Sequence, residues 1–401
     1  MLGIPKFALL SAFSVAIAMS GCVGGGEAGG KEETPASPIA RHPQAIVAYG
    51  LSDALSSVDL VTGSVTPNLG DIHIGPTTSR VKIRAGKAYI VNSGAFPEST
   101  NASVQVFDVA TAAPLATIPF PDGHNPIDIA FASDAKAYVT CLYGNNVTVI
   151  DLTKQGEEAI VKTIDLPVFE NDSGPVNAGP MGIVVSGRYA YTANCGFDLA
   201  ALAYVQGSVS VIDTATDTLV DVDNDLSNGA GTPIFTSQVN PQDLDAGPDG
   251  TLWVLCTGNY LDEFGVVDVI DPSDRWRLGP PIEIGGSPVT LTASHSAYAL
   301  IGAGDAVNAN LYVVRTDTHA VLHDSSDPLA LIAPAQGDGF WMVGKIAASA
   351  TGLIAYVPIG NTDPSVSKLV EVSLVPDHLE VTRTFDLSGS GRMPSSVALW
   401  E

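Results

Sequence analysis

The sequence has few basic residues for its length. Its 401 residues include 18 Lys and Arg against 43 Asp and Glu, so the formal net charge is −25. A surface of this charge repels phosphate backbones, which argues against a nucleic-acid partner. The same charge favours solubility, and we expect a monomer.

The common catalytic signatures are also missing. The sequence contains no G-x-S-x-G, no H-E-x-x-H, no phosphate-binding G-x-x-x-x-G-K-[ST] and no haem-attaching C-x-x-C-H. Its seven His residues are scattered along the chain. These absences exclude the enzyme classes that the motifs define. A fold that gathers residues from separate segments can still be an enzyme without them.

Long hydrophobic runs are confined to the N-terminus. Lys6 precedes an apolar stretch over residues 7–19 that is too short to span a bilayer, and Met19-Ser20-Gly21-Cys22 closes it. This arrangement resembles a bacterial lipoprotein signal, in which cleavage leaves an acylated Cys22 as the new N-terminus. The alternative is an ordinary secretory signal with a chance Cys at this position.

We therefore predict a signal peptide over residues 1–21 and a flexible Gly-rich tether over 22–44. Val23 rather than Asp follows Cys22, which favours the outer membrane of a Gram-negative cell envelope. We expect the protein to be attached to the membrane through this lipid anchor, because no later segment is long and apolar enough to form a spanning helix.

From residue 45 onward the chain repeats a three-strand pattern at intervals of roughly 50 residues, the spacing of propeller blades. A strand that usually begins with Pro precedes a strand bearing Tyr or Trp, and a third strand then alternates at period two. The clearest copies read NPIDIAFASDAKAYVTC…VTVID, GPMGIVVSGRYAYTANC…VSVID and NPQDLDAGPDGTLWVLC…VDVID. The aligned first strands begin at Thr78, Pro126, Pro180, Pro241, Pro288, Val343 and Pro394.

The two ends of this pattern complement each other. The repeat region starts with a strand of the second type, AIVAYG, and ends with an unpaired strand of the first type, SSVALW. We therefore predict an all-β fold over 45–401. It is a seven-bladed β-propeller of four-stranded antiparallel blades, closed by pairing of the C-terminal strand with the N-terminal blade.

Asp recurs where the third strands end. The positions are Asp108, Asp151, Asp213 and Asp271. One interpretation is an acidic ring that binds metals. The preferred one is that each side chain caps the following turn, because Asp commonly accepts hydrogen bonds from the backbone just beyond it.

These strands resemble the YVTN family of β-propeller repeats. The matching segments are AYIVN at 88–92, AYVTC at 137–141 and SVSVIDTAT at 208–216, and the resemblance covers nearly all of 45–400. It implies a propeller in an exported protein. Related seven-bladed propellers include lactonases and quinoprotein-like dehydrogenases, but none of their catalytic residue sets can be matched to this sequence.

Long loops are expected on one face of the ring. The turns between strands one and two and between three and four are short, whereas the other connections extend, as at 95–102, 196–206 and 224–239. Insertions gathered on one face mark a candidate binding face. Its aromatic candidates are Phe197, Tyr204, Phe235, Tyr260 and Trp341.

Three cysteines are expected on the same face. Cys141 and Cys256 end second strands, as Asn92 does in an earlier blade, and Cys195 lies one residue beyond such an end. With His124 from a blade-to-blade loop they could bind Cu or Zn. Because second strands of neighbouring blades are usually too far apart for shared ligation or a disulfide, we prefer buried, unligated thiols.

A calcium site is a further candidate. Asp221, Asp223 and Asp225 form the D-x-D-x-D start of a calcium-binding loop. Leu226 stands where such loops have Gly, and Thr232 stands where they have a bidentate Glu. The segment is either a Ca²⁺ site completed by other ligands or a solvated acidic loop.

Together these patterns favour a cell-envelope lipoprotein whose propeller is a non-catalytic binding module. Its ligand, a protein, glycan or small molecule, is expected on the long-loop face. The alternatives are a propeller enzyme, either a lactonase-like hydrolase or a quinoprotein-like oxidoreductase, and an envelope metal-binding protein.

Overall fold

The computed structural model describes residues 42–75, 77–171, 174–198, 200–223, 231–294, 296–305, 307–332, 340–376 and 378–401. The predicted signal peptide, most of the predicted tether with Cys22, and Asp225 lie outside these residues. Within them, no helix has the length and apolar character needed to cross a membrane.

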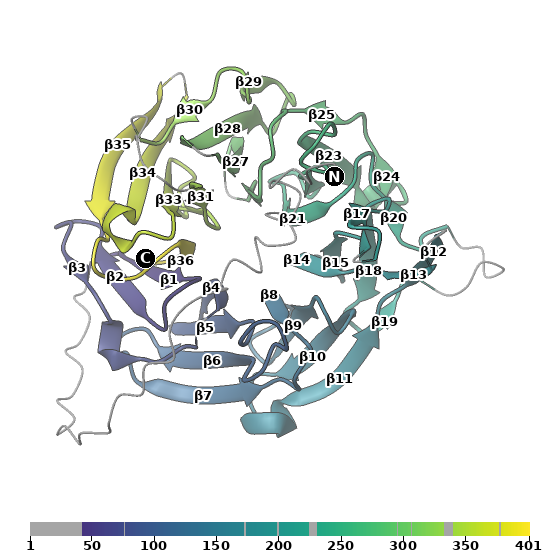
Figure 1. Cartoon of the computed structure of the whole chain (residues 1–401), viewed down its shortest axis with the longest axis horizontal. Helices are drawn as coiled ribbons and strands as arrows, with labels where there is room; N and C mark the ends of the chain where they lie inside the picture. Colours follow the sequence, from purple (N-terminus) through teal and green to yellow (C-terminus); the bar gives the residue numbers. More distant parts are fainter. Residues whose placement is uncertain are drawn as a thin grey trace, which may run out of the picture.

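Seven antiparallel sheets in the described part of the chain surround a central axis (Figure 1). The predicted seven-bladed propeller is therefore confirmed. Its closure is confirmed as well, because β36 (Pro394–Trp400) pairs with β1 (Gln44–Tyr49) and places Leu399 opposite Ala45. The first and last strands of the ring thus share one blade.

The strands of each blade are given from the axis to the rim. Blade 1 comprises β36, β1, β2 (Leu55–Asp59) and β3 (Val65–Thr66). Blade 2 comprises β4 (Thr78–Arg84), β5 (Lys87–Asn92), β6 (Ser103–Asp108) and β7 (Pro114–Pro119). Blade 3 comprises β8 (Pro126–Phe131), β9 (Lys136–Cys141), β10 (Asn146–Asp151) and β11 (Ile160–Asp165). Blade 4 comprises β14 (Pro180–Ser186), β15 (Tyr189–Asn194), β18 (Ser208–Asp213) and a split rim strand, β19 (Thr218–Leu219) and β20 (Ile234–Phe235).

The rim strand is also split in the next two blades. Blade 5 comprises β21 (Pro241–Ala246), β22 (Leu252–Cys256), β23 (Val266–Asp271), β24 (Arg277–Leu278) and β25 (Ile282–Glu283). Blade 6 comprises β26 (Thr290–Thr292), β27 (Tyr298–Gly304), β28 (Ala309–Arg315), β29 (Val321–His323) and β30 (Leu329–Ala330). Blade 7 comprises β31 (Met342–Val343), β32 (Ala347–Ala348), β33 (Ile354–Gly360), β34 (Lys368–Val375) and β35 (His378–Asp386). Short 3-10 turns are η1 (Leu69–Asp71), η2 (Gly156–Ala159), η4 (Pro272–Asp274) and η5 (Pro364–Val366).

Buried apolar side chains join each blade to the next. Between blades 6 and 7, for example, Leu300 and Val313 pack in one cluster with Val357 and Val370. A corresponding cluster joins blade 7 to blade 1 across the closure. Because each fully buried Val, Leu or Ile side chain contributes about 1.5–3 kcal/mol, these interfaces stabilise the ring as a whole.

The recurrent aspartates of the third strands cap turns, as predicted. Asp108 accepts a hydrogen bond from the backbone N–H of Thr111 at 2.9 Å, and Asp151 accepts one from that of Thr153 at 2.9 Å. Asp213 and Asp271 make the equivalent bonds two residues onward. The acidic metal ring is therefore the wrong interpretation of these positions.

Two long connections contain hairpins that the sequence pattern did not predict. The hairpin of β12 (Val168–Asn171) and β13 (Gly174–Asn177) lies between blades 3 and 4, and that of β16 (Phe197–Asp198) and β17 (Ala203–Tyr204) lies within blade 4. The Asn171 amide donates to the Asp198 carboxylate at 3.0 Å, which ties the two hairpins together. Both belong to the long-loop face.

Candidate functional site

One position of the aligned inner strands recurs around the axis. It is the second residue after each aligned start, and its occupants are Arg80, Asp128, Gly182, Asp243, Thr290, Lys345 and Ser396. The strands β4, β8, β14 and β21 carry a register shift at or next to this position. Because bulges re-aim side chains, they help to direct this ring of seven positions, the axial ring, into the channel.

Blade 7 reaches the axial ring by a different route. Its inner strand, predicted as one segment from Val343, is broken into β31 and β32, and Lys345 lies in the break. The Lys345 backbone pairs with Ser396 of blade 1 instead. A Cβ on Gly344 would lie 2.5 Å from the Pro394 carbonyl oxygen, so only Gly permits this close approach. In blade 6 the predicted start at Pro288 is also shifted, to Thr290.

Ion pairs connect the axial ring across blades. Asp243, which is 0% exposed, lies 2.8 Å from the Lys345 ammonium and 3.7 Å from Arg80 Nη2. Asp128, which is 1% exposed, lies 2.8 Å from the Lys82 ammonium and 3.5 Å from Arg80 Nε. Arg80 therefore bridges two buried carboxylates that come from different blades.

Nearby cations keep the buried Asp128 carboxylate ionised. Burial alone would raise the pKa of Asp128, but Lys82, Arg80 and Lys345 together lower it below its usual value. Asp243 also accepts hydrogen bonds from the Leu291 backbone N–H at 2.9 Å and from the Thr290 hydroxyl at 3.1 Å. These bonds fix where Arg80 and Lys345 lie.

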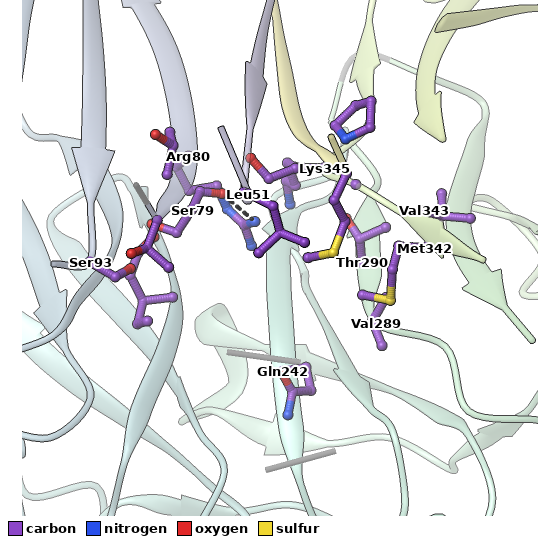
Figure 2. Close-up of a pocket in the computed structure, with 18 of the residues that line it drawn as sticks. Leu51, Ser79, Arg80, Ser93, Gln242, Val289, Thr290, Met342, Val343 and Lys345 are labelled. Carbon is purple, nitrogen blue, oxygen red and sulfur yellow. Dashed lines mark hydrogen bonds between the residues drawn. The ribbon is translucent and has the colours of Figure 1, made fainter. Parts of the chain in front are cut away.

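A cavity of about 140 Å³ is lined by the two cations Arg80 and Lys345 of this network and by residues of the inner strands (Figure 2). Arg80, Ser79 and Ser93 line one side, and Lys345 lies across from them toward Thr290. Among the described lining residues, Arg80 and Lys345 are the only titratable ones, with side chains 12% and 13% exposed. Although the protein has a formal net charge of −25, the titratable side chains that line this cavity are therefore positively charged.

Arg80 has hydrogen-bonding capacity to spare. Within the described residues its guanidinium makes one hydrogen bond, from Nη1 to the Ser79 carbonyl at 3.3 Å. The neighbouring hydroxyls are committed to backbone carbonyls: Ser79 donates to Ile127 and Ser93 donates to Pro126. Nε is buried and faces Asp128, so the donors left for a negatively charged or carbonyl oxygen in the cavity are those of the terminal nitrogens Nη1 and Nη2.

The predicted aromatic residues divide between two places. Tyr260 and Trp341 line a second cavity of about 330 Å³, which also touches Val289, Met342 and Val343 of the central one. The other three lie outside both cavities. Phe197 and Tyr204 pack against each other with tilted rings whose centroids are 4.9 Å apart, and Phe235 is 41% exposed at the rim.

Asn92 and His124 have local roles in the structure. Asn92 is 2% exposed, donates to the Asn101 carbonyl at 3.1 Å and accepts from the Gly94 N–H at 3.3 Å, so it orders its own loop. The His124 backbone carbonyl accepts from the Gly144 N–H at 3.2 Å. Neither residue lines the central or the second cavity.

The three cysteines are free, buried and separate. Cys141 packs between blades 2 and 3, Cys256 packs between blades 4 and 5, and Cys195 packs with Ile127 and Met181. Burial raises the pKa of Cys141 to about 12 and that of Cys195 to about 11. No group of three or more His, Cys, Asp or Glu side chains within the described ranges is placed to hold a metal ion.

The calcium candidates are described only in part, since Asp225 lies outside the described residues. Asp221 is half-buried and accepts a hydrogen bond from the Thr232 N–H at 3.3 Å, while Asp223 is exposed. A Ca²⁺ site at this loop stays a prediction.

The axial residues Arg80, Lys345, Asp128 and Asp243 were not predicted as a site. The signal was present in the aligned strands, because SRVKI, IDIAF, QDLDA and GKIAA place charges at one register position of inner strands. A charge recurring on the strand that faces the axis needs a partner across it. Comparison of the aligned strands by charge rather than by hydrophobicity would have found these residues.

No protein-family model and no curated protein sequence matches the chain. Solved structures do resemble it. The periplasmic gluconolactonase PpgL of Pseudomonas aeruginosa has a TM-score of 0.60 and 13% identity, over 90% of this chain and 99% of that one. A candidate 6-phosphogluconolactonase of Bacteroides fragilis has a TM-score of 0.59 and 13% identity, over 90% and 98%. A quinoprotein alcohol dehydrogenase-like protein of Bacteroides thetaiotaomicron has a TM-score of 0.56 and 14% identity, over 89% and 79%.

At these identities the likeness shows the fold. It nevertheless corrects the expectation of a non-catalytic binding module. The similar propellers are described as lactonases and as a dehydrogenase-like protein, so the comparisons favour the alternative of a propeller enzyme. The expectation was wrong because the sequence motifs indicate the strands of the blades, whereas the charged residues near the axis come together only in the folded ring.

Proposed function

We propose that this protein is a lactone hydrolase whose substrate is the lactone of a sugar acid. The observation that supports it most is the central cavity. Among its described lining residues, the titratable ones are two cations, Arg80 and Lys345, and each is held by a buried carboxylate. The gluconolactonases of the same fold support the choice of substrate class.

Lactone hydrolysis develops negative charge on the carbonyl oxygen. Water adds to the carbonyl carbon, the carbonyl oxygen becomes an oxyanion, and the ring C–O bond then breaks. The proton lost by the water is returned through solvent to the ring oxygen, which leaves a hydroxy acid. Arg80 and Lys345 stabilise the oxyanion, and Asp128 and Asp243 hold these two donors in place before the reaction begins.

Replacement of Arg80 by Gln tests the proposal. Loss of one oxyanion donor typically lowers kcat by about 10²- to 10³-fold. We expect a loss of this size for Arg80→Gln, and a smaller loss for Arg80→Lys, which keeps the charge. The measurement is titration of the acid released from glucono-δ-lactone, corrected for spontaneous hydrolysis.

Arg84→Gln is the matched control. Arg84 lies on the same strand, β4, but pairs with Asp134 at the surface, 2.7 Å away, and lines neither cavity. It is expected to keep wild-type turnover. Equal turnover by the Arg80→Gln and Arg84→Gln variants would overturn the proposal.

The proposal extends to export and to lipid anchoring through Cys22 in a bacterial envelope. Support comes from the signal-like sequence before Cys22 and from the periplasmic description of the Pseudomonas neighbour. Membership of the YVTN repeat family belongs to the proposal too, on its strand motifs. Cys22→Ser is expected to move the protein from the membrane fraction to the soluble fraction after cell lysis; retention with the membranes would contradict anchoring at this residue.

A further inference from the structure

The second cavity lies beside the central one and is larger. The two share Val289, Met342 and Val343 as a common wall. Small-molecule sites usually measure about 300–1,000 Å³, a range that the central cavity of about 140 Å³ does not reach and the second, of about 330 Å³, does. The two cavities adjoin, and their combined volume exceeds that of either one.

Two buried polar side chains of β28 line this second cavity without partners. Asn310 and Tyr312 are two residues apart on one strand, so both side chains lie on the same face. They are 8% and 5% exposed, and no hydrogen bond of either side chain is found within the described residues. Their polar atoms are open to the cavity, where a ligand hydroxyl can replace water as their hydrogen-bond partner.

Burial and nearby negative charge keep the Tyr312 hydroxyl protonated, so that it can donate a hydrogen bond. Burial, together with the nearby carboxylates of Asp305 and Asp324, raises the pKa of Tyr312 to about 12. The phenol is therefore protonated throughout the physiological range. Asp305, also in the lining, adds a carboxylate acceptor.

Aromatic side chains and glycines complete the walls. Tyr260 and Trp341 lie in the lining, and the backbone N–H of Trp341 donates to the Asp305 carbonyl at 2.8 Å. A Cβ on Gly304 would lie 1.8 Å from the Trp341 carbonyl oxygen, and one on Gly286 would lie 2.5 Å from the Tyr312 hydroxyl. Only glycine at these two positions allows the walls to approach as they do.

We propose that the second cavity binds a further sugar ring of the substrate, so that the preferred lactone is that of a disaccharide acid. A pyranose ring offers a C–H face to aromatic side chains and hydroxyls to an amide, a phenol and a carboxylate, which is the set present in the lining. This inference rests on the proposed lactone hydrolysis in the central cavity, which would hold the reacting ring.

Two measurements test it separately from the chemistry. The first is calorimetric titration with cellobionate, the open acid, which needs no turnover. The second compares kcat/KM for cellobionolactone with that for glucono-δ-lactone. The variants are Asn310→Ala and Tyr312→Phe, with Tyr298→Phe as control because Tyr298 is a buried tyrosine of the same blade that lines neither cavity.

Wild type and Tyr298→Phe are expected to bind cellobionate at least 10-fold more tightly than gluconate. Each cavity variant is expected to lose about 5- to 10-fold of that affinity and of kcat/KM for cellobionolactone, with turnover of glucono-δ-lactone unchanged. Equal binding of the two acids, or wild-type binding by both cavity variants, overturns the inference while lactone hydrolysis stands. Cavity-dependent cellobionate binding without hydrolysis of either lactone would overturn the proposed function, and with it the assignment of the bound sugar as part of a substrate.

Discussion

Two sets of aspartates occupy repeated positions in this propeller, one near the axis and one at the end of the third strands. Asp128 and Asp243 belong to inner strands, are almost fully buried, and each faces cations from other strands. Asp108 and Asp151 end third strands and accept hydrogen bonds from the backbone just beyond them. The residue type is the same, but the partner is a long cationic side chain in one set and a local N–H in the other.

The comparison shows how the same repeat supports both the fold and a candidate site. A turn aspartate interacts within its own blade, so its loss disturbs one turn. Asp243 interacts with side chains of three other blades, so its loss leaves buried cations in two of them, Arg80 and Lys345. A charge without a partner costs far more in the interior than at the surface.

The largest expected effect is at the axis. Asp243→Asn removes the charge that faces Lys345 and Arg80 and is expected to lower the free energy of unfolding by about 3–5 kcal/mol. Urea unfolding followed by tryptophan fluorescence measures it. Asp134→Asn is the control, because Asp134 pairs with Arg84 at the surface with its side chain 77% exposed; its effect is expected within about 0.5 kcal/mol. Equal losses in the two variants would remove the distinction between axis and surface.

The sequence predicted the blades better than the site for a physical reason. Strands such as SVSVID and AYVTC are rich in apolar and β-branched residues because both of their faces pack against neighbouring blades, so their composition reflects their burial. Ring closure followed from the unmatched strands AIVAYG and SSVALW. The hairpins of β12–β13 and β16–β17 are too short for such a pattern to reveal.

The site depends on contacts between residues far apart in sequence. Arg80 meets Asp243 only because blades 2 and 5 face the same channel, and Lys345 reaches it because blade 7 is broken at Gly344. Neither fact leaves a local periodic pattern. Tyr260 and Trp341 were predicted to lie on the long-loop face. The cavity that they share with Asn310 and Tyr312 forms only when blade 6 packs against its neighbours, which the sequence pattern does not show.

A smaller effect is expected at the turns. Asp108→Ala removes the acceptor for both the N–H and the hydroxyl of Thr111, each at 2.9 Å, and is expected to lower the free energy of unfolding by about 1 kcal/mol. Asp108→Asn, which keeps an acceptor oxygen, is expected to lose less. The same urea titration measures both variants. A loss at Asp108→Ala as large as that at Asp243→Asn would show that the turn, too, is coupled to the rest of the ring.

The smallest effect is expected in the acid dependence of stability. The hydroxyl and N–H of Thr153 lower the pKa of Asp151 below its ordinary value of 3.8. A lowered folded-state pKa contributes stability that is complete above the ordinary value and is lost as pH falls through the folded one. Between pH 5 and pH 2, we therefore expect the free energy of unfolding of the wild type to fall more steeply with decreasing pH than that of Asp151→Asn. The difference in slope corresponds to the uptake of at most about one proton on unfolding. Thr153→Val removes the hydroxyl and keeps the N–H, so its slope is expected to lie between those of the wild type and Asp151→Asn. If Asp151→Asn had the same slope as the wild type, the Asp151 carboxylate would have the same pKa in the folded and unfolded chains.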